Sequence, residues 1–115
     1  METELKQIKE IVKNTTVKTA KENCIKVYEL KKIIIKNLKE DEESYLFGPN
    51  NCPFCELYYH SECQDCPIYL RTNQEKCKNN IPFQKLCTIR TWDRYNNKEK
   101  MLKLLNEEIE FLKSL

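Results

Sequence analysis

Residues 98–115 read KEKMLKLLNEEIEFLKSL, and this stretch decides the fold class. Its apolar side chains return every three or four residues along the whole segment. They are Met101, Leu102, Leu104, Leu105, Ile109, Phe111, Leu112 and Leu115. This spacing gathers them on one face of an α-helix and leaves the charged residues on the other. The sequence therefore predicts a C-terminal amphipathic helix over 98–115.

The first forty residues follow the same pattern, because apolar residues recur at helical spacing from position 5 to position 38. The run NTTV at 14–17 interrupts it with poor helix formers, so one kinked helix or two consecutive helices would fit. Thr19 and Glu22 have the spacing of a capping box that restarts a helix. We expect an N-terminal helical segment over 1–40 that pairs with the C-terminal helix as an antiparallel hairpin.

A cysteine-rich module separates these two segments. Five of the seven cysteines fall in this module, at Cys52, Cys55, Cys63, Cys66 and Cys77. The first four form two C-x2-C pairs, and such pairs supply the thiolates of a tetrahedral zinc site. Prolines at 53, 67 and 82 break any long element. We expect a loop-rich zinc knuckle over 50–97, at the tip of the hairpin.

Four of these five cysteines are expected to bind the metal. The two C-x2-C pairs are the simplest set, but only seven residues separate them, and Cys77 in place of Cys63 gives an alternative set. His60 is a further candidate ligand. Cys24 lies in the apolar stripe of the N-terminal segment, and we interpret it as a small buried hydrophobic residue.

Other uses of the cysteines fit the sequence less well. Disulfides are disfavoured by the odd number of cysteines and by an N-terminus that does not resemble a secretory signal. An iron–sulfur cluster would favour the tighter C-x2-C-x2-C spacing, although Pro67 does follow Cys66 as in ferredoxins. A thioredoxin-like redox pair at Cys52 and Cys55 lacks the strand-to-helix context that this motif requires.

The residues that carry a family resemblance are Cys52-x-x-Cys55, Cys63-x-x-Cys66-Pro67-Ile68-Tyr69, Thr72, Cys77, Ile81-Pro82-Phe83 and the final Glu110-Phe111-Leu112-Lys113-Ser114-Leu115. This string resembles small Cys-rich proteins of bacteriophages, archaeal viruses and proviruses, which read C-x-x-C, C-x-x-C-P, a lone C and a T-P-Y-like tripeptide. The resemblance covers about residues 50–115, although the tripeptide at 81–83 departs from T-P-Y. It implies a viral or mobile-element origin and a zinc-finger-like knuckle that includes Cys77.

Residues 76–98 form a basic stretch with interleaved aromatic residues. Six Lys or Arg side chains oppose a single acid, Asp93, which gives a local charge of six minus one, or +5. Basic side chains beside aromatic rings are typical of nucleic-acid surfaces, and the residues predicted to make such contacts are Lys85, Arg90, Trp92 and Arg94. The alternative is that the aromatic residues fill the core beneath the metal loop.

Composition limits the remaining choices. A chain of 115 residues forms one domain, 1–115, and its net charge of +2 is too small for a polybasic nucleic-acid binder. A charged fraction of 33% and the lack of a long apolar run predict no membrane span. No secretory signal is visible in the first ten residues, so we expect an intracellular protein, and the viral resemblance implies the cytoplasm of a host cell. With one glycine the chain cannot build a Gly-rich phosphate loop.

The sequence thus predicts a single all-α domain, a helical hairpin or small bundle, with a zinc knuckle inserted between the N-terminal and C-terminal helices. We expect a non-enzymatic zinc-binding protein that acts as an interaction or regulatory module on a protein partner. The alternatives are a transcription regulator-like protein that binds nucleic acid and an inhibitor of a host protein. The wide apolar stripes are also compatible with a homodimer.

Overall fold

The computed structural model describes residues 2–40, 51–58, 66–72, 81–90 and 93–115. Their helices, in chain order, are α1 (Glu2–Lys13), α2 (Ala20–Lys36), α3 (Pro53–Tyr58), α4 (Pro67–Thr72), α5 (Ile81–Thr88), the 3-10 turn η5 (Tyr95–Asn97) and α6 (Lys98–Lys113). These ranges contain no strand, so the predicted all-α class is confirmed. Within the same ranges, every helix is too short or too polar to cross a bilayer.

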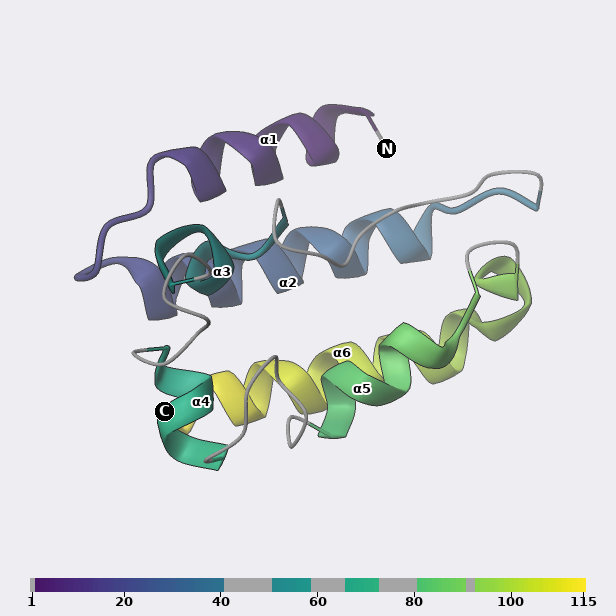
Figure 1. Cartoon of the computed structure of the whole chain (residues 1–115). Helices are drawn as coiled ribbons and strands as arrows, with labels where there is room; N and C mark the ends of the chain where they lie inside the picture. The colour runs from purple at the N-terminus through teal and green to yellow at the C-terminus, as the bar shows by residue number, and fades with distance from the viewer. Residues whose placement is uncertain (1, 41–50, 59–65, 73–80, 91–92) are drawn as a thin grey trace.

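The two long helices α2 and α6 lie side by side and run in opposite directions (Figure 1). The Lys98 ammonium at the start of α6 donates a hydrogen bond to the Lys36 carbonyl at the end of α2, with an N···O distance of 3.4 Å. The expected antiparallel pairing is therefore present. α1 packs against the side of α2 away from α6, and α5 packs along α6.

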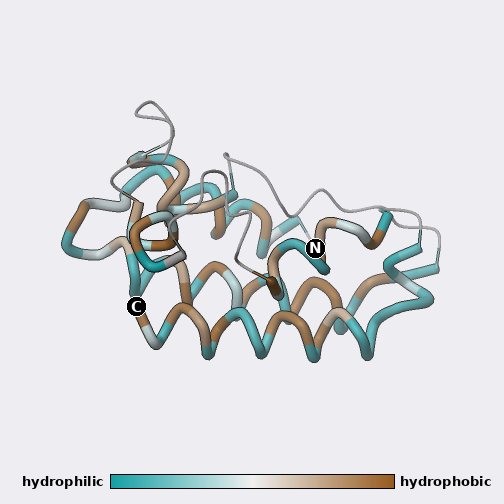
Figure 2. Tube along the Cα trace, turned by 60° about the horizontal axis from the view of Figure 1, so that its bottom comes forward, coloured by the Kyte–Doolittle hydropathy of each residue, from teal (hydrophilic) through white to brown (hydrophobic). Residues whose placement is uncertain are grey.

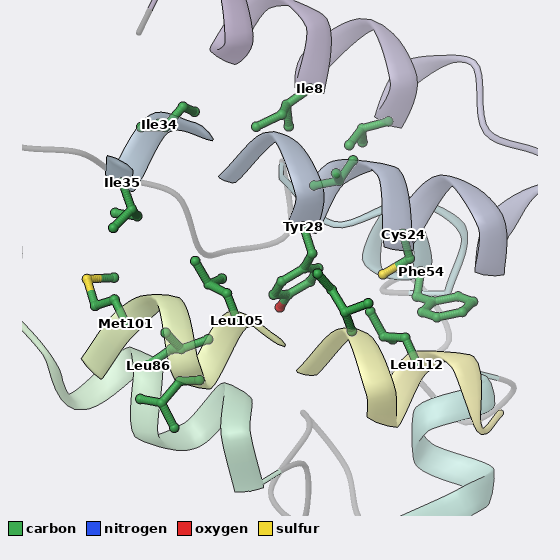
Figure 3. Close-up of a cluster of buried hydrophobic side chains, with 14 of the residues drawn as sticks. Ile8, Cys24, Tyr28, Ile34, Ile35, Phe54, Leu86, Met101, Leu105 and Leu112 are labelled. Carbon is green, nitrogen blue, oxygen red and sulfur yellow. The ribbon is translucent and has the colours of Figure 1, made fainter. Parts of the chain in front are cut away.

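The core lies mainly between α2 and α6. Val27 and Ile35 on α2 and Leu105 and Leu112 on α6 are fully buried, and Leu86 of α5 closes the core from below (Figure 3). Along α6 the hydrophilic residues are on the outer side of the helix and the hydrophobic ones face the rest of the chain (Figure 2). The helical spacing of the apolar residues in the sequence therefore correctly predicted which face of α6 is buried.

The N-terminal segment forms two helices rather than one kinked helix. The break falls at the predicted NTTV run, and the Asn23 side-chain amide donates a hydrogen bond to the Thr15 hydroxyl across the turn, at 3.0 Å. The predicted capping box is absent, because Thr19 has helical φ and ψ and makes no side-chain cap hydrogen bond. Its hydroxyl instead accepts a hydrogen bond from the Thr16 backbone N–H at 2.9 Å.

The described parts of the cysteine module are more helical than we expected. Pro53 and Pro67 begin α3 and α4 instead of breaking helices. A proline fits at the first position of a helix because the backbone N–H there has no intrahelical partner. Of the described parts of the module, α3 does not lie at the tip of the hairpin that α2 forms with α6, since it packs against α1 and α2.

Candidate metal centre

Cys52 and Cys55 lie together at the start of α3. The Cys52 carbonyl accepts the first hydrogen bond of the helix, from Glu56 N–H at 3.0 Å, so Cys52 occupies the N-cap position. The thiol and the backbone N–H of Cys55 both donate hydrogen bonds to the Cys52 sulfur. Pro53 and Phe54 between them are buried and fix this turn against the core. The first C-x2-C pair thus presents two neighbouring sulfurs.

Cys24 joins this pair from α2. Its side chain is 1% exposed, as the sequence interpretation required, but it is more than a small apolar residue. The Cys24 thiol is hydrogen-bonded to the Cys52 sulfur, and this bond, together with burial, raises the pKa of Cys24 well above its usual range. The hydrogen bonds from Cys24 and Cys55 hold the pKa of Cys52 well below its usual range. Among these thiols, the negative charge therefore belongs on Cys52.

Lys31 is the cation of this site. It follows Cys24 by two helical turns on the same face of α2, and it is 1% exposed. Its Nζ lies 4.3 Å from the centroid of the Tyr28 ring. Burial lowers the pKa of Lys31, while the charges of Cys52, Cys24 and Glu108 act in the opposite direction. The ammonium in turn helps to lower the Cys52 pKa.

Glu108 brings an acid to the same region from α6, and it too is 1% exposed. Its charge acts on Lys31 and on Cys24, so the two long helices both contribute ionisable groups next to the thiols. Cys24 is visible at the edge of the core, beside Phe54 and above Leu112 (Figure 3). The site is therefore built at the junction of α2, α3 and α6.

Of the remaining predicted ligands, only Cys66 lies in the described part of the chain. Cys66 is buried at the start of α4, where its carbonyl accepts a hydrogen bond from Leu70 N–H at 2.9 Å. Cys63, Cys77 and His60 lie outside the described residues. Within the described ranges, no three His, Cys, Asp or Glu side chains are arranged to hold a metal ion. The Cys52–Cys55 pair fits one half of a zinc site, because its donors are soft sulfurs and one of them readily loses its proton.

The residues predicted to contact nucleic acid differ in their exposure to solvent. Lys85 on α5 and Arg90 after it are exposed, whereas Arg94 is 5% exposed and packs within the molecule. Its guanidinium is therefore not on the surface where a phosphate would bind. Trp92 lies outside the described residues.

Sequence reasoning missed Cys24, Lys31 and Glu108 as members of the site. A signal was present, because Lys31 and Glu108 each occupy a position of the apolar stripe of their helix. A charged residue at a core position of an amphipathic helix is rarely buried without a partner. That Lys31 and Glu108 approach the same thiols could not be read from either helix alone.

Comparisons of the chain with protein-family models, with curated proteins and with solved structures find no match. The resemblance to viral Cys-rich proteins is not tested by these comparisons and stays a prediction.

Proposed function

We propose that the protein is a small zinc-stabilised interaction module without catalytic activity. The observation that carries the proposal is the Cys52–Cys55 pair, whose sulfurs are neighbours at the start of α3 with the Lys31 cation nearby. Cys52 and Cys55 would hold the ion from one side. Two further ligands would come from Cys63, Cys66 and Cys77, as the C-x2-C spacing and the viral resemblance predict.

Zinc in such a site supplies a redox-inert, tetrahedral link between chain segments. The surrounding residues have separate tasks. Lys31 offsets the negative charge of the thiolates, and Phe54 anchors the first ligand pair in the core. Folding of a small module is then coupled to metal binding, since the ligand set exists only in the folded chain. The helices α1, α2 and α6 provide the frame that presents the module to a protein partner.

Elemental mass spectrometry of protein purified without added metal tests this proposal, together with a thiol count and a visible spectrum. We expect one zinc per chain. Cys52→Ser and Cys55→Ser should each lose most of the zinc, whereas Cys87→Ser, on the exposed surface of α5 and outside the predicted ligand set, should retain it. Iron with visible absorbance, or a metal-free protein with paired cysteines, would overturn the proposal.

Binding of nucleic acid is a second candidate function, and the exposure of Lys85 and Arg90 is the observation that favours it. Contacts with phosphates release counterions, so the affinity for DNA or RNA should fall steeply as salt is added. A Lys85→Ala, Arg90→Ala double variant should bind more weakly than a double variant of two exposed lysines on α1, Lys9→Ala and Lys13→Ala. Equal affinities for the two variants would remove this candidate.

A further inference from the structure

An apolar groove runs between α1 and α2, with a volume of about 730 Å³. The apolar side chains that line it are Ile11 of α1 and Ile25, Leu30 and Ile33 of α2. Ile33 is 42% exposed, and the other three are half-buried. The groove belongs to the layer of the molecule farthest from α5, because α2 separates α1 from α6 (Figure 1).

The groove exists because α2 is apolar on two sides. Cys24, Tyr28 and Ile35 are buried on the side of α2 that faces α6 (Figure 3). Each residue of a helix turns the side chain by about 100°, so Ile25 and Ile33 lie on a different arc of the helix from these three. α1 has 12 residues against the 17 of α2 and does not cover that second arc completely, because Ile33 stays 42% exposed. A contiguous apolar patch left on the surface of a charged protein is typical of an interaction site.

The charges at the rim of this groove alternate. α1 contributes Lys6 and Glu10, and α2 contributes Lys26 and Glu29. The two helices form an antiparallel hairpin, so Lys6 and Glu29 are both on the side away from the connecting turn. Glu10 and Lys26 are both on the side near the turn. Each helix therefore has one cation and one anion, in opposite order along the groove.

This alternation is complementary to itself. A two-fold axis parallel to the helices would place α1 of one copy over α2 of the other, with Lys6 facing Glu29 and Glu10 facing Lys26. A two-fold axis across the helices would place α1 over α1, with Lys6 facing Glu10. In both arrangements a cation meets an anion, and like charges are kept apart.

We propose that a second copy of this chain packs on the α1–α2 groove, and that the protein forms a two-fold symmetric dimer through four helices. The four apolar side chains of each copy supply the buried centre, and the alternating charges supply the polar rim. Glu29 and Lys26, whose own side chains are mostly exposed, already make intrachain pairs, with Lys32 at 3.5 Å and with Glu22 at 3.6 Å. Such pairs contribute little to stability, so exchanging them for pairs between copies costs little.

The dimer is expected to dissociate on dilution, since two short helices per copy form a small interface compared with those of obligate dimers. It does not depend on the zinc site, because none of the groove residues belongs to the cysteine module. Metal content measured on the same samples therefore separates a failure of the dimer from a failure of the proposed function.

Sedimentation velocity over a concentration series of the full chain is the first test. We expect the mass to rise from 13.9 kDa toward twice that value with increasing concentration. Ile33→Glu should abolish the rise, because it places a charge among the apolar side chains of the interface. The matched control is Leu70→Glu on α4, where an equally apolar side chain is 66% exposed outside the groove, and it should dimerise like the wild type.

Charge reversal is the second test, and it does not disturb an apolar residue. Lys6→Glu should weaken the dimer at least several-fold, and addition of Glu29→Lys or Glu10→Lys should restore it, each rescue corresponding to one of the two axes. Lys9→Glu, on the same helix but outside the groove, gives the same change in net charge and should have no effect. A wild-type chain that stays monomeric at its highest soluble concentration would overturn the proposal. A dimer that Ile33→Glu and Lys6→Glu leave unchanged would also overturn it. The same holds if a different protein, and not a second copy of this chain, binds in the groove.

Discussion

The thiols of Cys24, Cys52 and Cys55 and the ammonium group of Lys31 lie at the junction of α2, α3 and α6. The pKa values of Cys24 and Cys52 are shifted in opposite directions. Cys52 accepts hydrogen bonds from Cys24 and Cys55, so its pKa falls while the pKa of Cys24 rises. Lys31 adds a positive charge that favours the thiolate of Cys52. This unequal distribution prepares one sulfur to bind a metal ion at neutral pH without a large loss of protons on binding.

Alkylation rates of the individual cysteines should reveal this distribution in metal-free protein. The thiolate is the reactive form, so each rate rises with pH through the pKa of its thiol. Cys52 should reach its half-maximal rate below the usual pH of a cysteine, and Cys87, whose pKa is raised by partial burial, should reach it above that pH. Peptide mass spectrometry after iodoacetamide pulses measures both in one sample. A midpoint for Cys52 equal to or above that of Cys87 would contradict the assignment.

Lys31→Met should lower the affinity for zinc by about tenfold, which is the usual size of effects from groups that contact metal ligands. The reason is that the Cys52 thiolate would lose the positive charge of Lys31 that favours it, while methionine keeps a side chain of similar volume in the core. Competition with a chromophoric chelator measures the change. Lys36→Met on the same helix is the control, because its side chain is exposed, and equal affinities for both variants would refute this role of Lys31.

At the scale of the elements, short polar signals decide where helices begin and end. The Thr15 hydroxyl donates a hydrogen bond to the Ile11 carbonyl at 2.6 Å and accepts one from Asn23, and so links the end of α1 to the start of α2. We expected Pro53 and Pro67 to break helices, but they are the first residues of α3 and α4. Both observations concern the few backbone groups that a helix leaves without intrahelical partners.

Thr15→Val should destabilise the protein by about 1–2 kcal/mol, since it removes the hydroxyl from a nearly buried site and leaves the Asn23 amide with a poorer partner. Urea denaturation followed by circular dichroism measures the free energy of unfolding. Thr16→Val, one residue later and exposed, should change it by less than about 0.5 kcal/mol. Equal effects of the two substitutions would show that the link between α1 and α2 does not stabilise the fold.

Leu105→Ala tests the contact between α2 and α6. Leu105 is fully buried, and removing its side chain from a packed core should cost about 2–5 kcal/mol of unfolding free energy. The control is Leu70→Ala, because Leu70 is mostly exposed, and its loss should be small. The same denaturation experiment gives both values. A cost for Leu105→Ala no larger than that of Leu70→Ala would mean that α6 does not form the core described above.

At the scale of the whole molecule, apolar packing stabilises the helical frame, whereas the proposed zinc ion would stabilise the cysteine module. Most of the side chains buried between α2 and α6 are apolar, and neither helix carries a predicted ligand cysteine. Removing zinc with a strong chelator should therefore lower the melting temperature while most of the helical circular dichroism signal at low temperature remains. Calorimetry and far-UV spectra of the same sample measure the two effects. Complete loss of the helical signal on chelation would show that the frame cannot fold without the metal.

Much of this architecture follows from short-range patterns in the sequence. The spacing of Leu105, Ile109 and Leu112 predicted α6, and the NTTV run predicted an interruption, either a kink or a break, at the place where α1 ends and α2 follows. The positions of short helices in the cysteine module were not predicted, because Pro53 and Pro67 were interpreted only as helix breakers. A proline has both roles, and its effect depends on whether the residues that follow find a core to pack against.

The sequence by itself determined the all-α class, the two long amphipathic helices and the first pair of neighbouring sulfurs, because each depends on residues within a few turns of one another. Only the tertiary structure decided that Cys24 contacts Cys52, that Lys31 and Glu108 approach the same thiols, and that α1 and α2 leave an apolar groove. The physical reason is that helical periodicity shows which side chains are buried but not what they are buried against. That second choice is made by packing between helices that are far apart in the chain.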